Sequence, residues 1–172
     1  MDSEVDIKDN FLSEEELEKL KNHIYYDMTW RYTDSIDYED DRKDKETFQF
    51  FHSYIHNGVQ ISDLSSILPI LDKINPFIVH RIKINLLTRT PSIIENSFHI
   101  DILLKNNKLK HWTTSIFYVN SNDGYTKFRD GTKIESIKNR LISFPSNIPH
   151  LGTTCSNKKN RITINFNYYG RN

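Results

Sequence analysis

The sequence predicts a mainly β fold, a double-stranded β-helix or jelly roll with N-terminal helices packed on one sheet. Helical patterns are confined to about the first 75 residues. From residue 77 onward, short segments with period-2 alternation or β-branched residues follow one another. The chain has 172 residues, enough to bury the core of one domain but not comfortably of two. We therefore expect a single domain over residues 1–172, with residues 1–76 as helical support and residues 77–169 as the jelly-roll core.

The first predicted element is a helix over residues 14–25. Ser13, followed three residues later by Glu16, forms a capping box, in which each side chain accepts a backbone N–H of the other residue. Leu12 and Leu17, on either side of the cap, fit a hydrophobic staple. The apolar stripe that would face the core repeats at helical spacing and consists of Leu17, Leu20 and Ile24.

The region between the two predicted helices contains a charged segment and an aromatic one. Residues 34–46 are dense in charged side chains, which predicts a solvated loop, with a mobile lid or a substrate loop as the alternative. The segment Phe48–His56 is aromatic and ends at Asn57-Gly58, which is a strong turn signal. A strand is therefore favoured over a helix for this segment.

A second helix is expected after Ser62 or Asp63, either of which can act as its N-cap. The apolar residues that follow lie on one predicted helix face, at Leu64, Ile67, Leu68, Leu71 and Ile74. Pro69 lies inside this pattern, where a proline removes a backbone hydrogen bond and crowds the preceding turn. Pro69 therefore counts against an uninterrupted helix.

Eight strands are expected in the remainder of the chain, separated by segments rich in Asn, Gly, Asp and Pro. Their ranges are 78–87, 97–104, 113–119, 125–128, 133–136, 140–144, 150–154 and 161–168. Two of these strands alternate clearly between apolar and polar side chains. The residues predicted to face the helices are Ile82, Ile84, Leu86, Ile162, Ile164 and Phe166. The residues predicted to face a wet cavity include Arg81, Lys83, Asn85, Arg161, Thr163 and Asn165.

The overall composition narrows the class of function. Lysine plus arginine and aspartate plus glutamate number 23 each, so no net field draws the chain to nucleic acid or to an anionic membrane. The single cysteine, Cys155, excludes a disulfide within the chain and favours the reducing cytosol. With no signal peptide and no run of about 20 apolar residues, we expect a cytoplasmic protein. The abundance of Asn, Lys and Ile is typical of an AT-rich genome, viral or bacterial.

His99 and Asp101 are the first candidates for metal ligands. Residues two apart in a strand project from the same face, so both side chains can reach one ion. His150, in a separate predicted strand, can supply a third ligand. Two histidines and one carboxylate leave three coordination positions open, which is typical of non-haem Fe(II) oxygenases. The His-x-Asp pattern taken alone is weak, and an ordinary surface or core histidine at position 99 is the alternative.

An arginine opens the last predicted strand. If Arg161 points into the barrel, it needs an anion, because an unpaired buried charge is costly. Its planar fork suits a carboxylate, and the hydroxyl of Thr163 adds a donor on the same face. The alternative is that Arg161 lies at the strand end and reaches solvent.

These features together resemble the 2-oxoglutarate/Fe(II) oxygenases, and most closely their prolyl-hydroxylase-like branch. His99-x-Asp101 looks like the first two iron ligands of that family, and His150 looks like the distal one. Arg161-x-Thr163 follows His150 by eleven residues and resembles the pair that binds the distal carboxylate of 2-oxoglutarate. The resemblance covers roughly residues 78–168 well and the first 75 residues loosely.

Three other segments bear on this resemblance. Residues 123–128 are similar to the branch's Gly-Gly-x-Thr-x-Phe segment, with Asp123 in place of the first glycine. Residues 116–120 look like the strand whose tyrosine also touches the 2-oxoglutarate carboxylate, which implies this role for Tyr118. Many members of the branch carry a tyrosine on the strand before the first iron ligand, near the proximal end of 2-oxoglutarate, and here Asn85 stands in that stretch as its substitute. This departure bears on prolyl specificity more than on the co-substrate.

The resemblance implies a hydroxylase that uses Fe(II), 2-oxoglutarate and O2, with ascorbate in support, and releases succinate and CO2. Its target would be an unactivated C–H bond of a protein, first of all of a prolyl residue, or of a small molecule. No catalytic residue is implied beyond the metal ligands. One alternative is a nucleic-acid demethylase on the same scaffold, which the neutral net charge disfavours. The other is a non-enzymatic metal-binding jelly-roll module, which would have no use for Arg161-x-Thr163.

Overall fold

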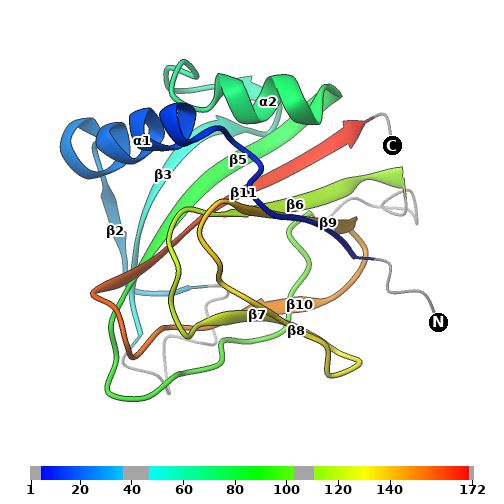
Figure 1. Ribbon diagram of the computed structural model, residues 1–172. Coiled ribbons are helices and arrows are strands. Elements are labelled where there is room, and N and C mark those ends of the chain that lie inside the picture. Colours follow the sequence, from blue (N-terminus) through cyan, green and yellow to red (C-terminus); the bar gives the residue numbers. More distant parts are fainter. Residues whose placement is uncertain (1–4, 37–46, 103–110, 171–172) are drawn as a thin grey trace.

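The computed structural model describes residues 5–36, 47–102 and 111–170, which form two antiparallel sheets with helices on one side (Figure 1). In these residues the larger sheet has eight strands, with β4 (Val59–Gln60) paired to β3. Its remaining strands lie in the order β1 (Asp6–Lys8), β9 (Arg140–Pro145), β6 (Thr113–Tyr118), β11 (Asn160–Gly170), β5 (Pro76–Thr88), β3 (Gln49–His56) and β2 (Arg31–Thr33). The smaller sheet has the order β10 (His150–Gly152), β7 (Tyr125–Phe128) and β8 (Lys133–Glu135).

The helices and the smaller sheet lie on opposite faces of the larger sheet. Helices α1 (Glu14–Asn22) and α2 (Leu68–Ile74) cover one face, and β7, β8 and β10 lie beyond the other, as Figure 1 shows. This arrangement confirms the predicted jelly roll with helices packed on one sheet. The segment before residue 76 also supplies β1, β2, β3 and β4, so it builds part of the larger sheet as well as the helices that cover it.

The predicted capping box begins α1. The Ser13 hydroxyl accepts the backbone N–H of Glu16 at 3.2 Å, and a Glu16 carboxylate oxygen accepts the N–H of Ser13 at 2.8 Å. Leu17 and Leu20 are buried on the inner face of the helix. After Asn22 the helix continues as one π-helical turn, His23–Asp27, so the element reaches slightly beyond its predicted end.

The second helix is shorter than predicted. It begins at Leu68, after Ile67, and neither Ser62 nor Asp63 caps it. The reason is Pro69, which lacks an N–H and is tolerated only in the first turn, where that group has no partner in the helix. The helix ends at Asn75, whose φ of 51° is the left-handed conformation that closes a helix.

The prediction of a strand over residues 97–104 is wrong for residues 97–102, its described part. Only His99 pairs there, in an isolated bridge with His150. In an antiparallel ladder the next hydrogen-bonded pair would be residues 101 and 148, and the N–H of Ile148 instead donates to the carbonyl of Pro145 at 3.0 Å, in the turn before β10. The segment 100–102 therefore forms no further ladder with β10.

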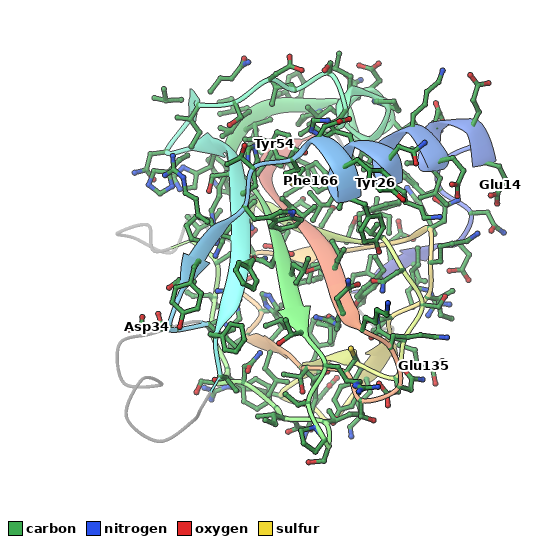
Figure 2. The ribbon with its side chains drawn as sticks, turned by 90° about the vertical axis from the view of Figure 1, so that its left-hand side faces the viewer. Glu14, Tyr26, Asp34, Tyr54, Glu135 and Phe166 are labelled. Atoms are coloured by element: carbon green, nitrogen blue, oxygen red, sulfur yellow. The ribbon has the colours of Figure 1, made fainter. Side chains whose placement is uncertain are left out.

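The alternating faces of the central strands agree with the predicted ones. Ile82, Ile84, Ile162, Ile164 and Phe166 belong to a buried cluster with Leu17, Leu20 and Ile24 of the helical region. Figure 2, where β3, β5 and β11 run side by side, labels Tyr54 and Phe166 of this cluster near α1. A second, smaller cluster lies between the two sheets and contains Ile116, Tyr118, Phe128 and Phe144. The larger core thus joins the helices to the sheet, and the space between the sheets holds the smaller apolar cluster together with polar residues.

Two expectations fall partly outside the described residues. The charged segment 34–46 is described only to residue 36, so its assignment as a loop or lid is not addressed beyond that point. The strand expected to reach residue 104 likewise continues into residues 103–110, outside the described part. None of the helices in the described ranges has both the length and the apolar character that crossing a membrane requires.

Candidate active site

The antiparallel contact between residue 99 and β10 brings two histidines together. The N–H of His99 donates to the carbonyl of His150 at 2.9 Å, and the N–H of His150 donates back at 3.0 Å. The two residues are therefore direct cross-strand neighbours, and such neighbours have adjacent side chains. Their ring centroids lie 4.8 Å apart. This pairing, between residues 51 positions apart in the chain, is what places both imidazoles at one point.

Asp101 completes a group of three potential metal ligands. Its Oδ1 lies 3.7 Å from Nε2 of His99, and its Oδ2 lies 3.8 Å from Nε2 of His150. One ligand atom from each residue lies within 4.8 Å of the others. The Asp101 and His150 side chains are each 3% exposed, and that of His99 is 15% exposed. The structure thus brings together all three residues that the sequence singled out as metal ligands.

The hydrogen bonds of the two imidazoles determine which nitrogen faces the carboxylate. Nδ1 of His99 lies 3.1 Å from the carbonyl of Ser97, and Nδ1 of His150 lies 3.2 Å from the carbonyl of Ile148. A carbonyl only accepts, so each Nδ1 carries a proton and Nε2 is the nitrogen that faces the carboxylate. Nε2 of His150 is buried without a hydrogen-bond partner in the described residues. Two ring nitrogens directed at a buried carboxylate, at 3.7 and 3.8 Å, form a set of ligand atoms that fits a divalent metal.

The charge states of the group also suit a metal. Burial by itself would raise the pKa of Asp101, but His150, the Arg81 guanidinium, His99 and a hydrogen bond from Asn167 hold it well below its usual range. Burial lowers the pKa of His150, His99 lowers it further, and Asp101 opposes the change. The group therefore offers an ionised carboxylate and a neutral imidazole, the forms in which these residues bind metals.

A cavity adjoins the three residues and continues between the sheets. Its polar and charged lining comes mainly from β5 and β11 and includes Arg81, Lys83, Asn85, Arg161, Thr163 and Asn165. These are the residues that strand alternation predicted to face a cavity. A larger groove of about 660 Å³ lies elsewhere, near the ends of α2 and β11, and the only candidate metal-binding group in the described residues is not in it. Chemistry, rather than size, therefore selects the smaller cavity as the candidate site.

Arg161 is buried at the far end of this cavity. Its residue is 4% exposed, which excludes the alternative that it reaches solvent from the strand end. Nε donates to the Ser136 hydroxyl at 2.8 Å, Nη2 lies 3.4 Å from Oγ1 of Thr126, and the guanidinium lies 5.6 Å from the centroid of the Tyr118 ring. No ion pair joins it to a carboxylate among the described residues. A buried guanidinium with only neutral neighbours can accommodate a carboxylate ligand.

The other three predicted co-substrate residues surround Arg161. Thr163 is the cross-strand neighbour of both Asn85 in β5 and Tyr118 in β6, so the three lie at one level of the sheet. Thr163 and Asn85 line the cavity, whereas the Tyr118 hydroxyl donates to Thr126 at 2.7 Å. Oδ1 of Asn85 is buried without a donor in the described residues. The sheet register thus assembles residues from three strands.

Sequence reasoning missed several contacts at this site. Ser136 holds Nε of Arg161, and no local pattern distinguishes this serine from other turn residues. Gly124 lies so close to Arg161 that an added Cβ would be 2.7 Å from its Cδ and 2.7 Å from the carbonyl of Thr154. The similarity of residues 123–128 to the Gly-Gly-x-Thr-x-Phe segment was the available signal for Gly124 and Thr126. Asn167, which bonds Asp101, lies on the predicted polar face two residues beyond Asn165.

No family model matches the sequence, and no curated protein is significantly similar to it. Solved structures do match. One is a prolyl hydroxylase from Trichoplax adhaerens, solved in complex with a peptide fragment of the hypoxia inducible factor oxygen degradation domain. The alignment covers 98% of this chain and 84% of the hydroxylase chain, with a TM-score of 0.67 and 13% sequence identity. A second is an oxidoreductase of the 2OG-Fe(II) oxygenase family from Burkholderia pseudomallei. Its alignment covers 99% of this chain and 89% of the oxidoreductase chain, with a TM-score of 0.65 and 11% sequence identity. A third is the viral collagen prolyl hydroxylase of Paramecium bursaria Chlorella virus-1 in its 2OG complex. Its alignment covers 99% of this chain and 98% of the viral chain, with a TM-score of 0.61 and 15% sequence identity.

The chain has the fold of these hydroxylases and oxygenases. At 11–15% identity, the likeness concerns the fold. The alignments extend over nearly the whole chain, including the N-terminal region that the sequence resemblance covered only loosely.

Proposed function

We propose that this protein is a 2-oxoglutarate- and Fe(II)-dependent dioxygenase that hydroxylates an unactivated C–H bond. The observation that carries the proposal is the convergence of His99, Asp101 and His150 at one end of a cavity whose other end holds buried Arg161. Fe(II) held by such a triad supplies, with 2-oxoglutarate and O2, the oxidising power for hydroxylation, and succinate and CO2 are released.

In this proposal the residues of the chain perform two tasks. His99, Asp101 and His150 would hold the metal, and three protein ligands would leave room for the co-substrate to bind it. Arg161, assisted by Thr163, would bind the distal carboxylate of 2-oxoglutarate and keep the co-substrate in one orientation, and Asn85 would contact the co-substrate near its proximal end. The Tyr118 ring lies 5.6 Å from the Arg161 guanidinium and its hydroxyl donates to Thr126, so we assign Tyr118 an indirect part in this contact.

A protein substrate, first of all a prolyl residue, is the proposed target. The support is that structures of the same fold include prolyl hydroxylases, one of them with a bound peptide. The chain's departure at Asn85, where many prolyl hydroxylases have a tyrosine, makes a peptide panel with and without proline the informative substrate test.

The proposal is tested by measuring succinate formed from 2-oxoglutarate with Fe(II) and ascorbate, with and without O2. Wild-type protein is expected to give succinate that requires both iron and oxygen, and His99→Ala and Asp101→Ala are expected to give none. His80→Ala is the matched control, since His80 lies in β5 outside the triad and should retain activity. Full activity of Asp101→Ala would contradict the assignment of Asp101 as a metal ligand. Wild-type protein that neither turns over nor binds 2-oxoglutarate would favour a non-enzymatic binding module.

A further inference from the structure

Asp101 lies in a segment without regular strand pairing, so side chains must hold its carboxylate in place. Two donors from the larger sheet reach it. Nδ2 of Asn167 donates to Oδ2 at 3.0 Å, and Nη1 of Arg81 donates to Oδ1 at 3.3 Å. Each carboxylate oxygen therefore has one donor from the sheet and faces one histidine.

Asn167 is much the better anchored of the two donors. It lies in β11, in register with Arg81 of β5 and Thr114 of β6, and it is fully buried. Its Nδ2 also lies 3.0 Å from the Thr114 hydroxyl, which in turn lies 2.9 Å from the Ser146 hydroxyl. Arg81, in contrast, makes a longer bond from a flexible side chain that is 23% exposed.

The orientation of the Asn167 amide is also unusual for a purely structural residue. A carboxylate only accepts, so the NH2 end must face Asp101, and Oδ1 is then left buried without a donor in the described residues. A buried acceptor without a partner costs stability, and such groups in native structures call for an explanation. The explanation that fits the contacts is that the amide orients the carboxylate.

We propose that Asn167 is the positioning residue of the metal-binding carboxylate, whose amide fixes the side-chain conformation of Asp101 and so sets the affinity for a divalent metal. The inference rests on the proposed function in one respect, that Asp101 is a metal ligand. Loss of an outer hydrogen bond of this kind typically weakens metal binding by about 10- to 100-fold.

The test is titration of metal-free protein with Co(II), followed by calorimetry and by visible absorption. Asn167→Leu keeps the side-chain size and removes the donor, and it is expected to bind Co(II) about 10- to 100-fold more weakly with a changed spectrum at saturation. Asn165→Leu is the matched control, on the same face of the same strand but without a hydrogen bond to Asp101 among the described residues, and it should bind as wild type does. Circular dichroism verifies folding, and if Asn167→Leu does not fold, Asn167→Ala replaces it with the same expected loss.

The outcomes separate this inference from the proposed function. If wild-type protein does not bind Co(II), both are overturned. If wild type binds, Asp101→Ala does not, and Asn167→Leu has the wild-type affinity and spectrum, only the positioning role is overturned. Equal losses in Asn167→Leu and Asn165→Leu would also overturn it, because the effect would then not depend on the contact with Asp101.

Discussion

The two faces of β5 and β11 are made by alternate residues of the same strands, yet they differ in almost every physical property. On the helix side, Ile162, Ile164 and Phe166 are at most 1% exposed and lie in one apolar cluster. On the cavity side, Asn85, Asn165 and Asn167 each have a buried carbonyl oxygen without a donor in the described residues. This sheet therefore derives stability from one face and pre-arranges polar groups on the other at a cost in stability.

Truncation on the helix face should have the largest effect. Ile164→Ala removes a fully buried side chain from the main core and is expected to lower the free energy of unfolding by about 2–5 kcal/mol. Thr163→Ala, the adjacent residue on the cavity face, should cost about 1 kcal/mol or less but raise the 2-oxoglutarate concentration required. Urea unfolding and co-substrate titration of both variants measure the difference. If Ile164→Ala and Thr163→Ala lost equal stability, the proposed difference between the two faces would be contradicted.

Filling the space beside Arg161 should have an intermediate effect. In Gly124→Ala the new methyl group would press on Arg161 and on the carbonyl of Thr154, which should cost about 1–3 kcal/mol and weaken 2-oxoglutarate binding. Gly152→Ala is the control, because its Cβ would meet only Nη1 of Arg161, at an ordinary 3.5 Å. Calorimetry with 2-oxoglutarate on both variants tests this. A larger loss in Gly152→Ala would contradict the close contact at residue 124.

Replacing the buried charge itself should affect stability and function in opposite directions. Arg161→Met removes a guanidinium that has no carboxylate partner in the described residues, and it is expected to raise the free energy of unfolding by about 1 kcal/mol. The same variant should lose most of its affinity for 2-oxoglutarate and keep its metal affinity. Thermal unfolding in the absence of 2-oxoglutarate is the decisive measurement. A clear loss of stability would mean that Arg161 serves the core rather than a ligand.

The smallest expected effect lies at the surface of the helix side. The Lys73 ammonium, with the backbone N–H of Ser13, lowers the pKa of Glu16 to about 2 from its usual 4.5. A lowered pKa means that the ionised group stabilises the folded state fully above pH 4.5, and that this contribution is lost as the pH falls toward 2. Glu16→Gln should therefore be slightly less stable than wild type at pH 7, and the difference should vanish near pH 2. A difference that did not change with pH would show that charge is not the cause.

Much of the site could be predicted because its residues follow local patterns. The alternation of Arg161, Thr163 and Asn165 with Ile162, Ile164 and Phe166 is enough to assign each residue to a face of the sheet. The histidines and Asp101 were identified by residue type and spacing, although the strand assumed for residues 97–104 is absent in its described part. The structure nevertheless brings the side chains of His99 and Asp101 together with that of His150.

By itself, the sequence determined the fold class, the first helix with its cap, the two faces of the central strands and the types of residue at the site. These features depend on neighbours a few positions apart, whose periodicity and capping chemistry are local. Only the tertiary structure decided that His99 pairs with His150, that Ser136 and Gly124 adjoin Arg161, and that Asn167 holds Asp101. These contacts join residues 25 to 66 positions apart, or cross between sheets, and they depend on strand register, which no local pattern encodes.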